Sequence, residues 1–268
     1  MQIKELKKTL EEFGDNVRFE HDLKKKNWFN IGGKSKVYYK AENLKDLVNF
    51  LKKLNNKEKI FILGAGSNTL ISDNLYNGVV IKLSKNFNNI SLLGEDIIIA
   101  GSAVLDKSLS DFALNNNLSG FEFLSCIPGT IGGGIRMNAG CFGMEFKDIL
   151  LSIQAIEKSG NVITIPSKDI KFEYRKNNLS ENLIFLSASF KGIKGNYEQI
   201  NDKIKTLKKE KEKSQPIKIK TSGSTFKNPI LQSKKKVWEL IKESVPLDKS
   251  FGDAYISKKH CNFFVNKG

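Results

Sequence analysis

The chain has 268 residues, of which 40% are hydrophobic, and its formal net charge at pH 7 is +15. This length allows one large domain or two smaller ones, each with its own core. No segment approaches the roughly 18 to 20 uninterrupted apolar residues of a membrane span, and the charged N-terminus lacks a signal-peptide pattern, so we expect a cytoplasmic protein that does not enter a membrane.

The positive charge comes almost wholly from lysine. Only three of the 44 basic residues are arginines, namely Arg18, Arg136 and Arg175. The arginine guanidinium forms paired hydrogen bonds with phosphates and bases, which the lysine ammonium does not. A nucleic-acid-binding protein with so little arginine would therefore be unusual. We therefore expect no nucleic-acid partner, although the charge alone leaves that alternative open.

Cysteine and histidine are too few to form a metal site or a disulfide framework. The three cysteines, Cys126, Cys141 and Cys261, have no CxxC spacing, and His21 and His260 are the only histidines. We expect no metal, and each cysteine is interpreted as a buried structural thiol.

The first predicted element is an amphipathic helix in which Ile3, Leu6, Leu10 and Phe13 recur at helical spacing. A second helix is predicted from Leu44 to Leu54, with Asn43 as its N-cap. Short β-rich runs predict strands at 36–39, 60–63, 79–83, 97–100, 152–157, 161–165 and 183–190. Strands outnumber helices and do not alternate with them, so the fold class is predicted to be α+β.

The sequence also predicts a β-hairpin, a long helix and a domain boundary. Ser159 and Gly160 predict a hairpin between the strands at 152–157 and 161–165. A long basic helix is predicted over 196–213, and the main domain boundary near 192–195. The lysines of this helix are interpreted as a solvated face, with phosphate binding as the alternative.

A first glycine-containing loop follows the strand at 60–63. Its residues Gly64, Ala65, Gly66, Ser67 and Asn68 could point successive backbone N–H groups at a phosphate. The segment is not a dinucleotide fingerprint, because Thr69 occupies the place of the third glycine. An ordinary tight turn remains the alternative.

A second, denser glycine cluster lies about 60 residues further along, between Ser125 and Gly143. Glycine gives up side-chain burial, so such a cluster indicates positive φ angles or close approach of the backbone to a ligand. The two loops could hold one extended pyrophosphate ligand from both sides. Two unrelated turns remain the alternative.

Three further segments have compositions that are unusual for ordinary loops. Tyr174 and Arg175 place an aromatic ring beside one of the few arginines, residues 221–229 read TSGSTFKNP, and residues 257–266 read SKKHCNFFVN. Taken singly, each segment is most simply a loop.

Taken together and in this order, the segments resemble the flavoprotein family of UDP-N-acetylenolpyruvoylglucosamine reductases (MurB). The resemblance covers residues 27 to 266. The matching pieces are NWFNIGG at 27–33, LGAGSN at 63–68, GFEF at 120–123, IPGTIGG at 127–133, MNAG at 137–140, YR at 174–175, GSTFKNP at 223–229 and KHCNF at 259–263.

The resemblance implies a two-part FAD-binding region of the vanillyl-alcohol-oxidase (PCMH) type, followed by an α+β substrate domain. In this chain the parts are expected at 1–85, 86–192 and 193–268. The implied reaction is the NADPH-dependent reduction of an enolpyruvyl UDP-sugar to UDP-N-acetylmuramate for peptidoglycan synthesis, and a monomer is expected.

The resemblance also assigns roles to residues. FAD contacts are implied for Gly64, Ala65, Gly66, Ser67, Asn68, Ile127, Pro128, Gly129, Thr130, Gly132, Gly133, Asn138 and Gly140. The catalytic residues are Ser224, as proton donor, and Arg175, as the group that polarises the substrate carboxylate; Tyr174, Lys227 and Asn228 are expected to contact the substrate. In this interpretation side chains at the loop glycines would collide with the cofactor.

One departure from the family concerns its catalytic glutamate, which lies beyond the last matching motif, whereas this chain ends at Gly268. Glu239 and Glu243 are interpreted as surface positions and not as substitutes. The substrate domain is therefore expected to be C-terminally truncated, and the chain is predicted to bind FAD but to reduce substrate poorly.

Two alternatives remain at this stage. The chain could be an FAD-dependent oxidase or dehydrogenase of the wider vanillyl-alcohol-oxidase superfamily, which would share the glycine loops. It could also be a basic nucleic-acid-binding protein, which the lack of interleaved aromatic and basic residues opposes.

Overall fold

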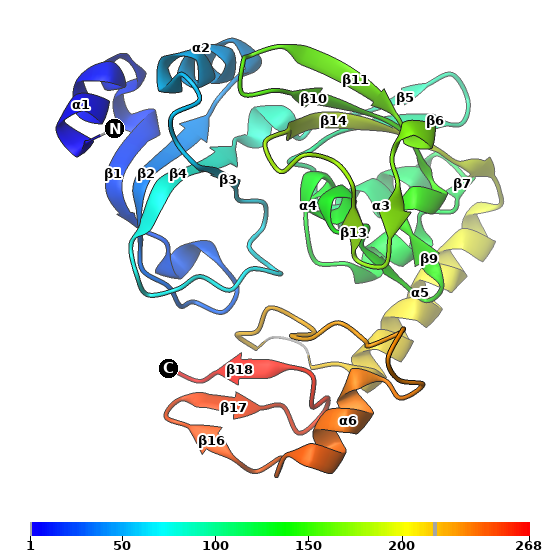
Figure 1. Ribbon diagram of the computed structural model, residues 1–268. Helices are drawn as coiled ribbons and strands as arrows, with labels where there is room; N and C mark the ends of the chain where they lie inside the picture. The colour runs from blue at the N-terminus through cyan, green and yellow to red at the C-terminus, as the bar shows by residue number, and fades with distance from the viewer. Residues whose placement is uncertain (1, 217–218) are drawn as a thin grey trace.

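A four-stranded sheet forms the first lobe of the molecule (Figure 1), in a computed structural model that describes residues 2–216 and 219–268. The strand order is β1-β2-β4-β3; β1 is antiparallel to β2, and β4 is parallel to both of its neighbours. The strands are β1 (Val17–Asp22), β2 (Lys34–Ala41), β3 (Ile60–Ile62) and β4 (Tyr76–Leu83).

Two helices, α1 (Ile3–Thr9) and α2 (Leu44–Leu54), cover one face of this sheet. Alternate residues of β2 and β4, such as Val37, Tyr39 and Val79, are buried against them, as period-two side-chain alternation requires. The ring of Tyr39 stacks on Phe50 of α2 with 3.7 Å between centroids. These contacts form the core of the first lobe.

The sequence prediction of a single helix from Ile3 to Phe13 is wrong in its length. The α-helix ends at Thr9, and a 3₁₀ turn, η1 (Glu11–Asn16), follows with Gly14 at φ 51°. The apolar spacing continues through this turn because its side chains still face the core, so spacing alone overestimates the helix.

The second lobe contains an entirely antiparallel sheet with the order β11-β10-β14-β6-β5. Its strands are β5 (Ile90–Leu93), β6 (Ile97–Gly101), β10 (Leu150–Ile156), β11 (Val162–Pro166) and β14 (Ile184–Lys191). The predicted hairpin around Ser159 and Gly160 is confirmed as β10 and β11.

Helices α3 (Asp106–Asn115) and α4 (Ile131–Arg136) pack on this sheet over a core that includes Phe121, Phe146 and Phe190. Four short structures complete the second lobe. They are the 3₁₀ turn η4 (Glu122–Cys126), the pair β7 (Leu118–Ser119) and β15 (Ile193–Lys194), the hairpin β8 (Gly140–Cys141) and β9 (Met144–Glu145), and the hairpin β12 (Phe172–Glu173) and β13 (Lys176–Asn177).

A long helix, α5 (Tyr197–Ser214), leads from the second lobe to a third one, at the bottom of Figure 1. The third lobe contains α6 (Val237–Ser244) and an antiparallel sheet of β16 (Ser250–Phe251), β17 (Ala254–Ile256) and β18 (Phe264–Asn266). The Asn266 amide of β18 donates a 2.7 Å hydrogen bond to the Phe29 carbonyl, so the chain returns to its first lobe.

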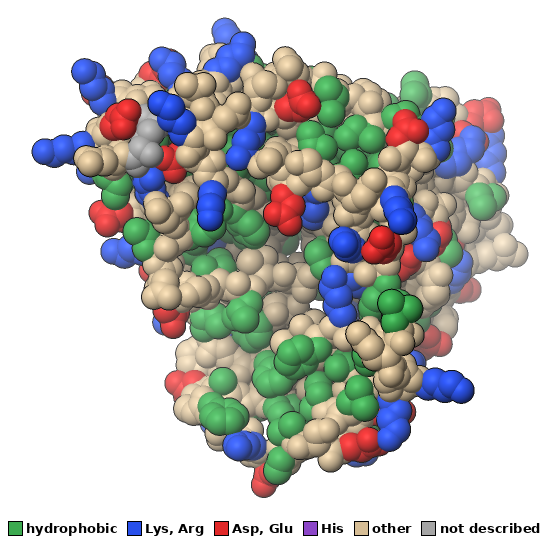
Figure 2. All heavy atoms as spheres, viewed as in Figure 1, with side chains coloured by type: hydrophobic (Ala, Val, Ile, Leu, Met, Phe, Trp, Pro, Cys, Tyr) green, Lys and Arg blue, Asp and Glu red, His purple; other side chains and the backbone are tan. Residues whose placement is uncertain are grey.

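Figure 2 shows hydrophobic side chains gathered on the third lobe, where Leu231 and Phe251 are exposed. Within residues 2–216 and 219–268, no helix has both the length and the apolar character needed to cross a membrane. The separate sheets and unevenly distributed helices agree with the predicted α+β class.

Candidate active site

The first glycine loop follows directly from β3, which ends at Ile62 beside the parallel strand β4. Lys82 of β4 donates a hydrogen bond to the Gly64 carbonyl at the start of this loop. Burial lowers the pKa of Lys82, and the nearby Lys26 lowers it further. Two basic side chains therefore lie beside the loop and favour an anionic ligand.

The second glycine loop runs from η4 into α4. Its backbone is fixed by the Asp106 N–H, which donates to the Gly129 carbonyl at 3.2 Å, and by the Ile131 N–H, which donates to Val104 at 2.9 Å. α3 and α4 thus begin side by side at this loop.

The two glycine loops are in direct contact. The Ser67 hydroxyl donates a hydrogen bond to the Pro128 carbonyl. A Cβ added to Gly64 would lie only 2.6 Å from Thr130 Oγ1. The structure therefore brings together two segments that are 61 residues apart in the sequence.

Most of the loop glycines are required by contacts within the protein. Gly66 has φ +70°, and a Cβ there would collide with the backbone carbonyl of Lys26; a Cβ on Gly129 would lie 2.7 Å from Asp106 Oδ2. Gly133 differs, because it is exposed and a Cβ there would meet only Thr130 Oγ1, at 3.6 Å. The interpretation that these glycines make room for a cofactor therefore has structural support only at Gly133.

The loops also carry backbone donors without partners. Among the described residues, nothing accepts a hydrogen bond from the backbone N–H groups of residues 65–68, 129, 130 and 133. Unpaired N–H groups on two touching loops are the kind of donors that bind an anion. This donor set fits the pyrophosphate of FAD.

Arg175 lies at the tip of the β12–β13 hairpin, with φ 56°. Its guanidinium donates to the carbonyls of Asn138 at 3.1 Å and Gly140 at 2.5 Å, and forms a 3.3 Å ion pair with Glu145. In the part of the chain that the structure describes, its Nε–H and one Nη2–H have no partner, so part of the fork can bind a carboxylate.

Asn138 has a structural task in this arrangement. It is fully buried, and its amide donates to Glu145 Oε2 at 2.9 Å and to the Glu173 carbonyl at 3.2 Å. Its Oδ1 accepts from the Lys147 N–H at 3.1 Å. Both amide donors are used, so its side chain supports the Arg175 hairpin and has no donor left for a cofactor.

The segment with Ser224 extends toward the Arg175 hairpin. Lys227 Nζ donates to the Arg175 carbonyl at 3.0 Å, and the Asn228 amide lies 3.3 Å from the Tyr174 hydroxyl. Ser224 is exposed, and its hydroxyl has no hydrogen-bond partner among the described residues. The structure thus attaches the segment that contains Ser224 to the hairpin of Tyr174 and Arg175 through Lys227 and Asn228.

Sequence reasoning missed two residues of this site. Glu145 pairs with Arg175, and the buried Asn262 holds the Ser224 segment through a 3.0 Å bond from the Phe226 N–H and a 2.9 Å bond to the Phe226 carbonyl. Asn262 lies inside the KHCNF motif, which was the available signal. Glu145 lies outside every matching piece, so nothing singled it out.

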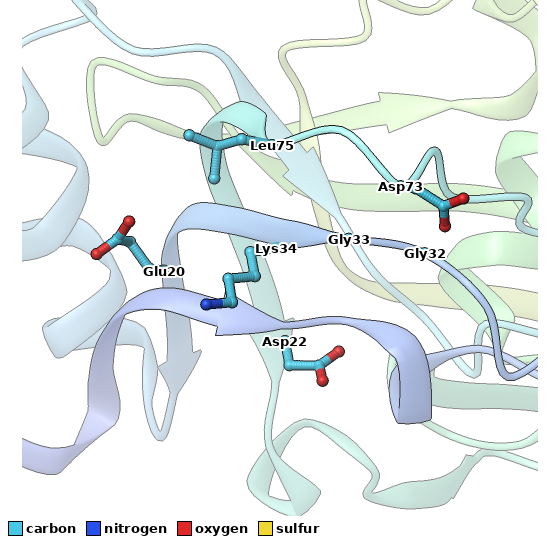
Figure 3. Close-up of a pocket in the computed structure, with 7 residues that line it drawn as sticks. All are labelled: Glu20, Asp22, Gly32, Gly33, Lys34, Asp73 and Leu75. Carbon is cyan, nitrogen blue, oxygen red and sulfur yellow. The ribbon is translucent and has the colours of Figure 1, made fainter.

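A pocket of about 370 Å³ in the first lobe contains none of the predicted site residues (Figure 3). Glu20, Asp22 and Asp73 bring three carboxylates to its lining, which disfavours a phosphate ligand. Gly33 of the NWFNIGG piece also lines it, and a Cβ there would collide with the Asp73 carbonyl. Close backbone packing therefore accounts for that glycine.

Two family models match the chain; one includes both glycine loops, the other includes Ser224, and Arg175 lies between the two matched ranges. Residues 35–166, which include both glycine loops, match the model of an FAD binding domain. Residues 215–268, which include Ser224, match the C-terminal domain of UDP-N-acetylenolpyruvoylglucosamine reductase. Fold and loops therefore define a flavoprotein oxidoreductase with a separate C-terminal domain.

The UDP-N-acetylenolpyruvoylglucosamine reductase of Pelagibacter ubique (strain HTCC1062) is 67% identical over 267 residues, which cover 100% of this chain and 88% of the relative. The chain belongs to the UDP-N-acetylenolpyruvoylglucosamine reductase family. The enzyme of that name from Rickettsia bellii (strain RML369-C) is 45% identical over 251 residues, covering 94% of this chain and 82% of the relative.

Solved structures agree with this membership. The crystal structure of UDP-N-acetylenolpyruvylglucosamine reductase from Thermus caldophilus has a TM-score of 0.82 at 30% identity, over 94% of this chain and 89% of that one. p-Cresol methylhydroxylase with substrate bound has a TM-score of 0.51 at 16% identity, over 73% of this chain and 44% of that one. The latter shares the fold alone, and it confirms the predicted PCMH-type architecture.

Proposed function

We propose that the chain reduces UDP-N-acetylenolpyruvoylglucosamine to UDP-N-acetylmuramate, with FAD as cofactor and NADPH as reductant, as a monomeric cytoplasmic enzyme of peptidoglycan synthesis. The observation that carries the proposal is the contact between two groups of residues. The donor-lined loops lie where the first and second lobes meet, and Lys227 and Asn228 of the third lobe attach the Ser224 segment to the Arg175 hairpin of the second.

Residues 65–68, 129, 130 and 133 would hold the FAD pyrophosphate through their backbone N–H groups, and Lys82 and Lys26 would offset its negative charge. A flavin held there would supply hydride transfer between NADPH and the substrate. The protein supplies position and electrostatic stabilisation for both transfers.

Arg175 binds the carboxylate of the enolpyruvyl group through the N–H groups that face no protein acceptor. Reduction of the double bond builds negative charge on the α-carbon and on this carboxylate, so a fixed guanidinium stabilises the charge as it forms. Glu145 and the carbonyls of Asn138 and Gly140 hold the guanidinium in place beforehand. Glu145 is therefore a positioning residue.

Ser224 delivers the proton that completes the reduction, from Oγ to the α-carbon. Its hydroxyl is exposed and has no protein acceptor among the described residues, so it is available to the substrate. Asn262 fixes the backbone that follows it through the Phe226 bonds. A serine is a weak acid, and the strongly basic enolate is what makes this transfer favourable.

Glu239 and Glu243 do not contribute to this chemistry. Glu239 accepts a 2.7 Å hydrogen bond from the Lys236 N–H, and Glu243 pairs with Lys235 at 2.8 Å on the surface of α6. Both carboxylates therefore have structural partners, in line with the surface role that we predict for them.

The test is an assay of NADPH oxidation by the purified chain loaded with FAD, with and without the enolpyruvyl UDP-sugar. We expect oxidation that depends on this substrate and yields UDP-N-acetylmuramate. Flavin reduction by a small alcohol without NADPH, or a protein unable to take up FAD, would overturn the proposal. The rate also tests the poor turnover that the sequence analysis predicts.

Ser224→Ala separates the proton-transfer role from binding. We expect NADPH to reduce the bound flavin at the rate of the unsubstituted chain, while reoxidation by the substrate slows on the order of 100-fold or more, as for loss of a general acid. Stopped-flow absorbance of the flavin measures the two half-reactions separately. Thr225→Ser, next to it and also exposed, is the control and is expected to leave both rates unchanged.

A further inference from the structure

Two cysteines and a lysine from three different elements meet beside the second glycine loop. Cys126 ends η4, and Cys141 lies in β8, where its thiol donates to the Phe123 carbonyl of η4 at 3.3 Å. Lys211 of α5 donates to the Cys126 carbonyl. The two thiols lie close enough that each shifts the pKa of the other.

The charges around the pair favour a thiolate on Cys126. Interaction with the Cys141 thiol lowers the pKa of the Cys126 thiol to about 6, and Ser125, Lys211 and Lys208 lower it too, against the opposing effect of burial. Interaction with Cys126, together with burial, raises the pKa of Cys141, which therefore keeps its proton. The pair combines a nucleophilic thiolate with a neighbouring thiol, as reactive cysteine sites do.

We propose that Cys126 and Cys141 are a redox modification site, at which a hydroperoxide converts the two thiols into an intramolecular disulfide. The proposal concerns residues to which the catalytic scheme gives no role, and it does not depend on that scheme.

The chemistry proceeds in two balanced steps with hydrogen peroxide as the oxidant. The Cys126 thiolate attacks one peroxide oxygen, which forms an S–O bond, breaks the O–O bond and releases hydroxide, leaving a sulfenic acid. The Cys141 sulfur then attacks the Cys126 sulfur, and water leaves with the Cys141 proton. The two cysteines lose two electrons, and the peroxide is reduced to two molecules of water.

The position of the pair links this oxidation to the active site. Cys126 immediately precedes the loop that begins at Ile127, and Cys141 follows Gly140, whose carbonyl binds Arg175. A disulfide would remove the anion that faces Lys211 and draw β8 toward η4. Oxidised protein is therefore expected to turn over substrate more slowly than reduced protein, with recovery after treatment with a thiol reductant.

Cys261 provides a matched control within the same chain. Its side chain is 6% exposed, against 5% for Cys126, and its thiol also donates to a backbone carbonyl, that of Trp238 at 2.9 Å. Within the described residues no lysine or second thiol is hydrogen-bonded to its thiol. A difference between the two cysteines is therefore due to their neighbours and not to access.

The first experiment treats the full chain loaded with FAD with hydrogen peroxide, blocks residual thiols with iodoacetamide, and maps the peptides by mass spectrometry. We expect a linked peptide pair containing Cys126 and Cys141, lighter by two hydrogen atoms than the reduced pair, with Cys261 still alkylated. In Cys141→Ser, we expect a Cys126 sulfenic acid that dimedone traps. Equal oxidation of Cys261, or disulfides between molecules only, would overturn the proposal.

The second experiment measures alkylation of each cysteine as a function of pH in the unoxidised chain. We expect the Cys126 profile to have its midpoint near pH 6 and to shift upward in Lys211→Met, with the Cys261 profile unchanged. If Lys211→Met does not fold, Cys141→Ala serves instead, because it removes the neighbouring thiol that most lowers the pKa of Cys126. A Cys126 midpoint at or above that of Cys261 contradicts the thiolate and hence the proposal.

Discussion

Gly133 and Gly66 lack side chains for different reasons, and alanine substitutions separate them. Gly133→Ala adds a methyl group to exposed helix where no protein atom lies within 3.4 Å, so we expect the apoprotein to be as stable or up to about 1 kcal/mol more stable. FAD affinity should fall, because the methyl group enters the donor-lined surface.

Gly66→Ala should instead destabilise the apoprotein. A φ of +70° costs an alanine roughly 1–2 kcal/mol, and the collision with Lys26 adds to that, so the apoprotein should lose stability. Differential scanning fluorimetry of the apoproteins and flavin-fluorescence titrations measure the two quantities. If both variants lose stability to the same extent, the distinction between the glycines is wrong.

Asp106 is a fully buried carboxyl at the start of α3, and neither oxygen has a hydrogen-bond partner in the described part of the chain. Burial raises its pKa well above 3.8. The unfolded chain therefore loses this proton at a lower pH than the folded chain. The contribution of Asp106 to the free energy of unfolding is fully present only below about pH 3.8. As the pH rises from there to the folded-state pKa, that contribution falls by up to about 1.4 kcal/mol per pH unit.

Asp106→Asn removes this proton uptake while keeping the shape of the side chain. We expect the variant to unfold with a higher free energy than the unsubstituted apoprotein at pH 7, and the difference to shrink as the pH falls toward 4. Urea unfolding at several pH values measures it. Parallel stability curves for the two proteins would show that Asp106 is ionised in the folded state.

The residues that sequence reasoning could identify are those inside motifs. Arg175, Lys227 and Asn228 were singled out by their neighbours along the chain, and the structure brings their segments together. Glu145 could not be found in this way, because its role depends on a partner 30 residues away that reaches it across the β12–β13 hairpin. A carboxylate becomes recognisable as a positioning group only when its guanidinium partner is known.

At the scale of single elements, a sequence signal predicts the structure well when its hydrogen-bond partner lies within the same element. The Asn43 side chain accepts the Asp46 N–H at 2.9 Å and caps α2, as the sequence predicts. β1 and β5 were missed, because each lies at the edge of its sheet and contains no fully buried residue, which weakens the hydrophobic pattern. The order of strands could not be predicted either, since it depends on which distant segments pair.

Asn43→Ala tests the cap of α2. The first turn of the helix would lose the acceptor for the Asp46 N–H, so we expect a loss of about 1 kcal/mol in unfolding free energy, within a range of 0.5–2. Asn43→Ser, which keeps an acceptor oxygen and places no second carboxylate beside Asp46, should remain close to the unsubstituted protein. Chemical denaturation of the apoproteins gives both values, and an alanine variant of unchanged stability contradicts the capping role.

At the scale of the whole molecule, FAD should act as a link between the first two lobes. The loop at 64–68 follows β3 of the first sheet, whereas the loop at 127–133 belongs to the second lobe, and each lobe has its own core. The predicted domain limits at 85 and 192 stay predictions. A ligand that contacts both loops stabilises the two lobes together.

Addition of FAD at 100 times its Kd should therefore raise the unfolding free energy by about 2.7 kcal/mol and Tm by roughly 5–10 °C. We expect the unfolding of the first two lobes to merge into one transition in differential scanning calorimetry. Adenosine diphosphate alone, which carries the pyrophosphate without the flavin, is the control and should give a smaller shift. An unchanged Tm with saturating FAD would mean that the loops do not hold the cofactor.

The hydrogen bond from Asn266 to Phe29 also affects how the third lobe can move. That lobe is attached to the rest of the molecule through α5, through this bond, and through the bonds from Lys227 and Asn228 to the Arg175 hairpin. Attachment at three separate places restrains rotation of the lobe as well as translation. We therefore expect the segment that carries Ser224 to keep one position relative to Arg175.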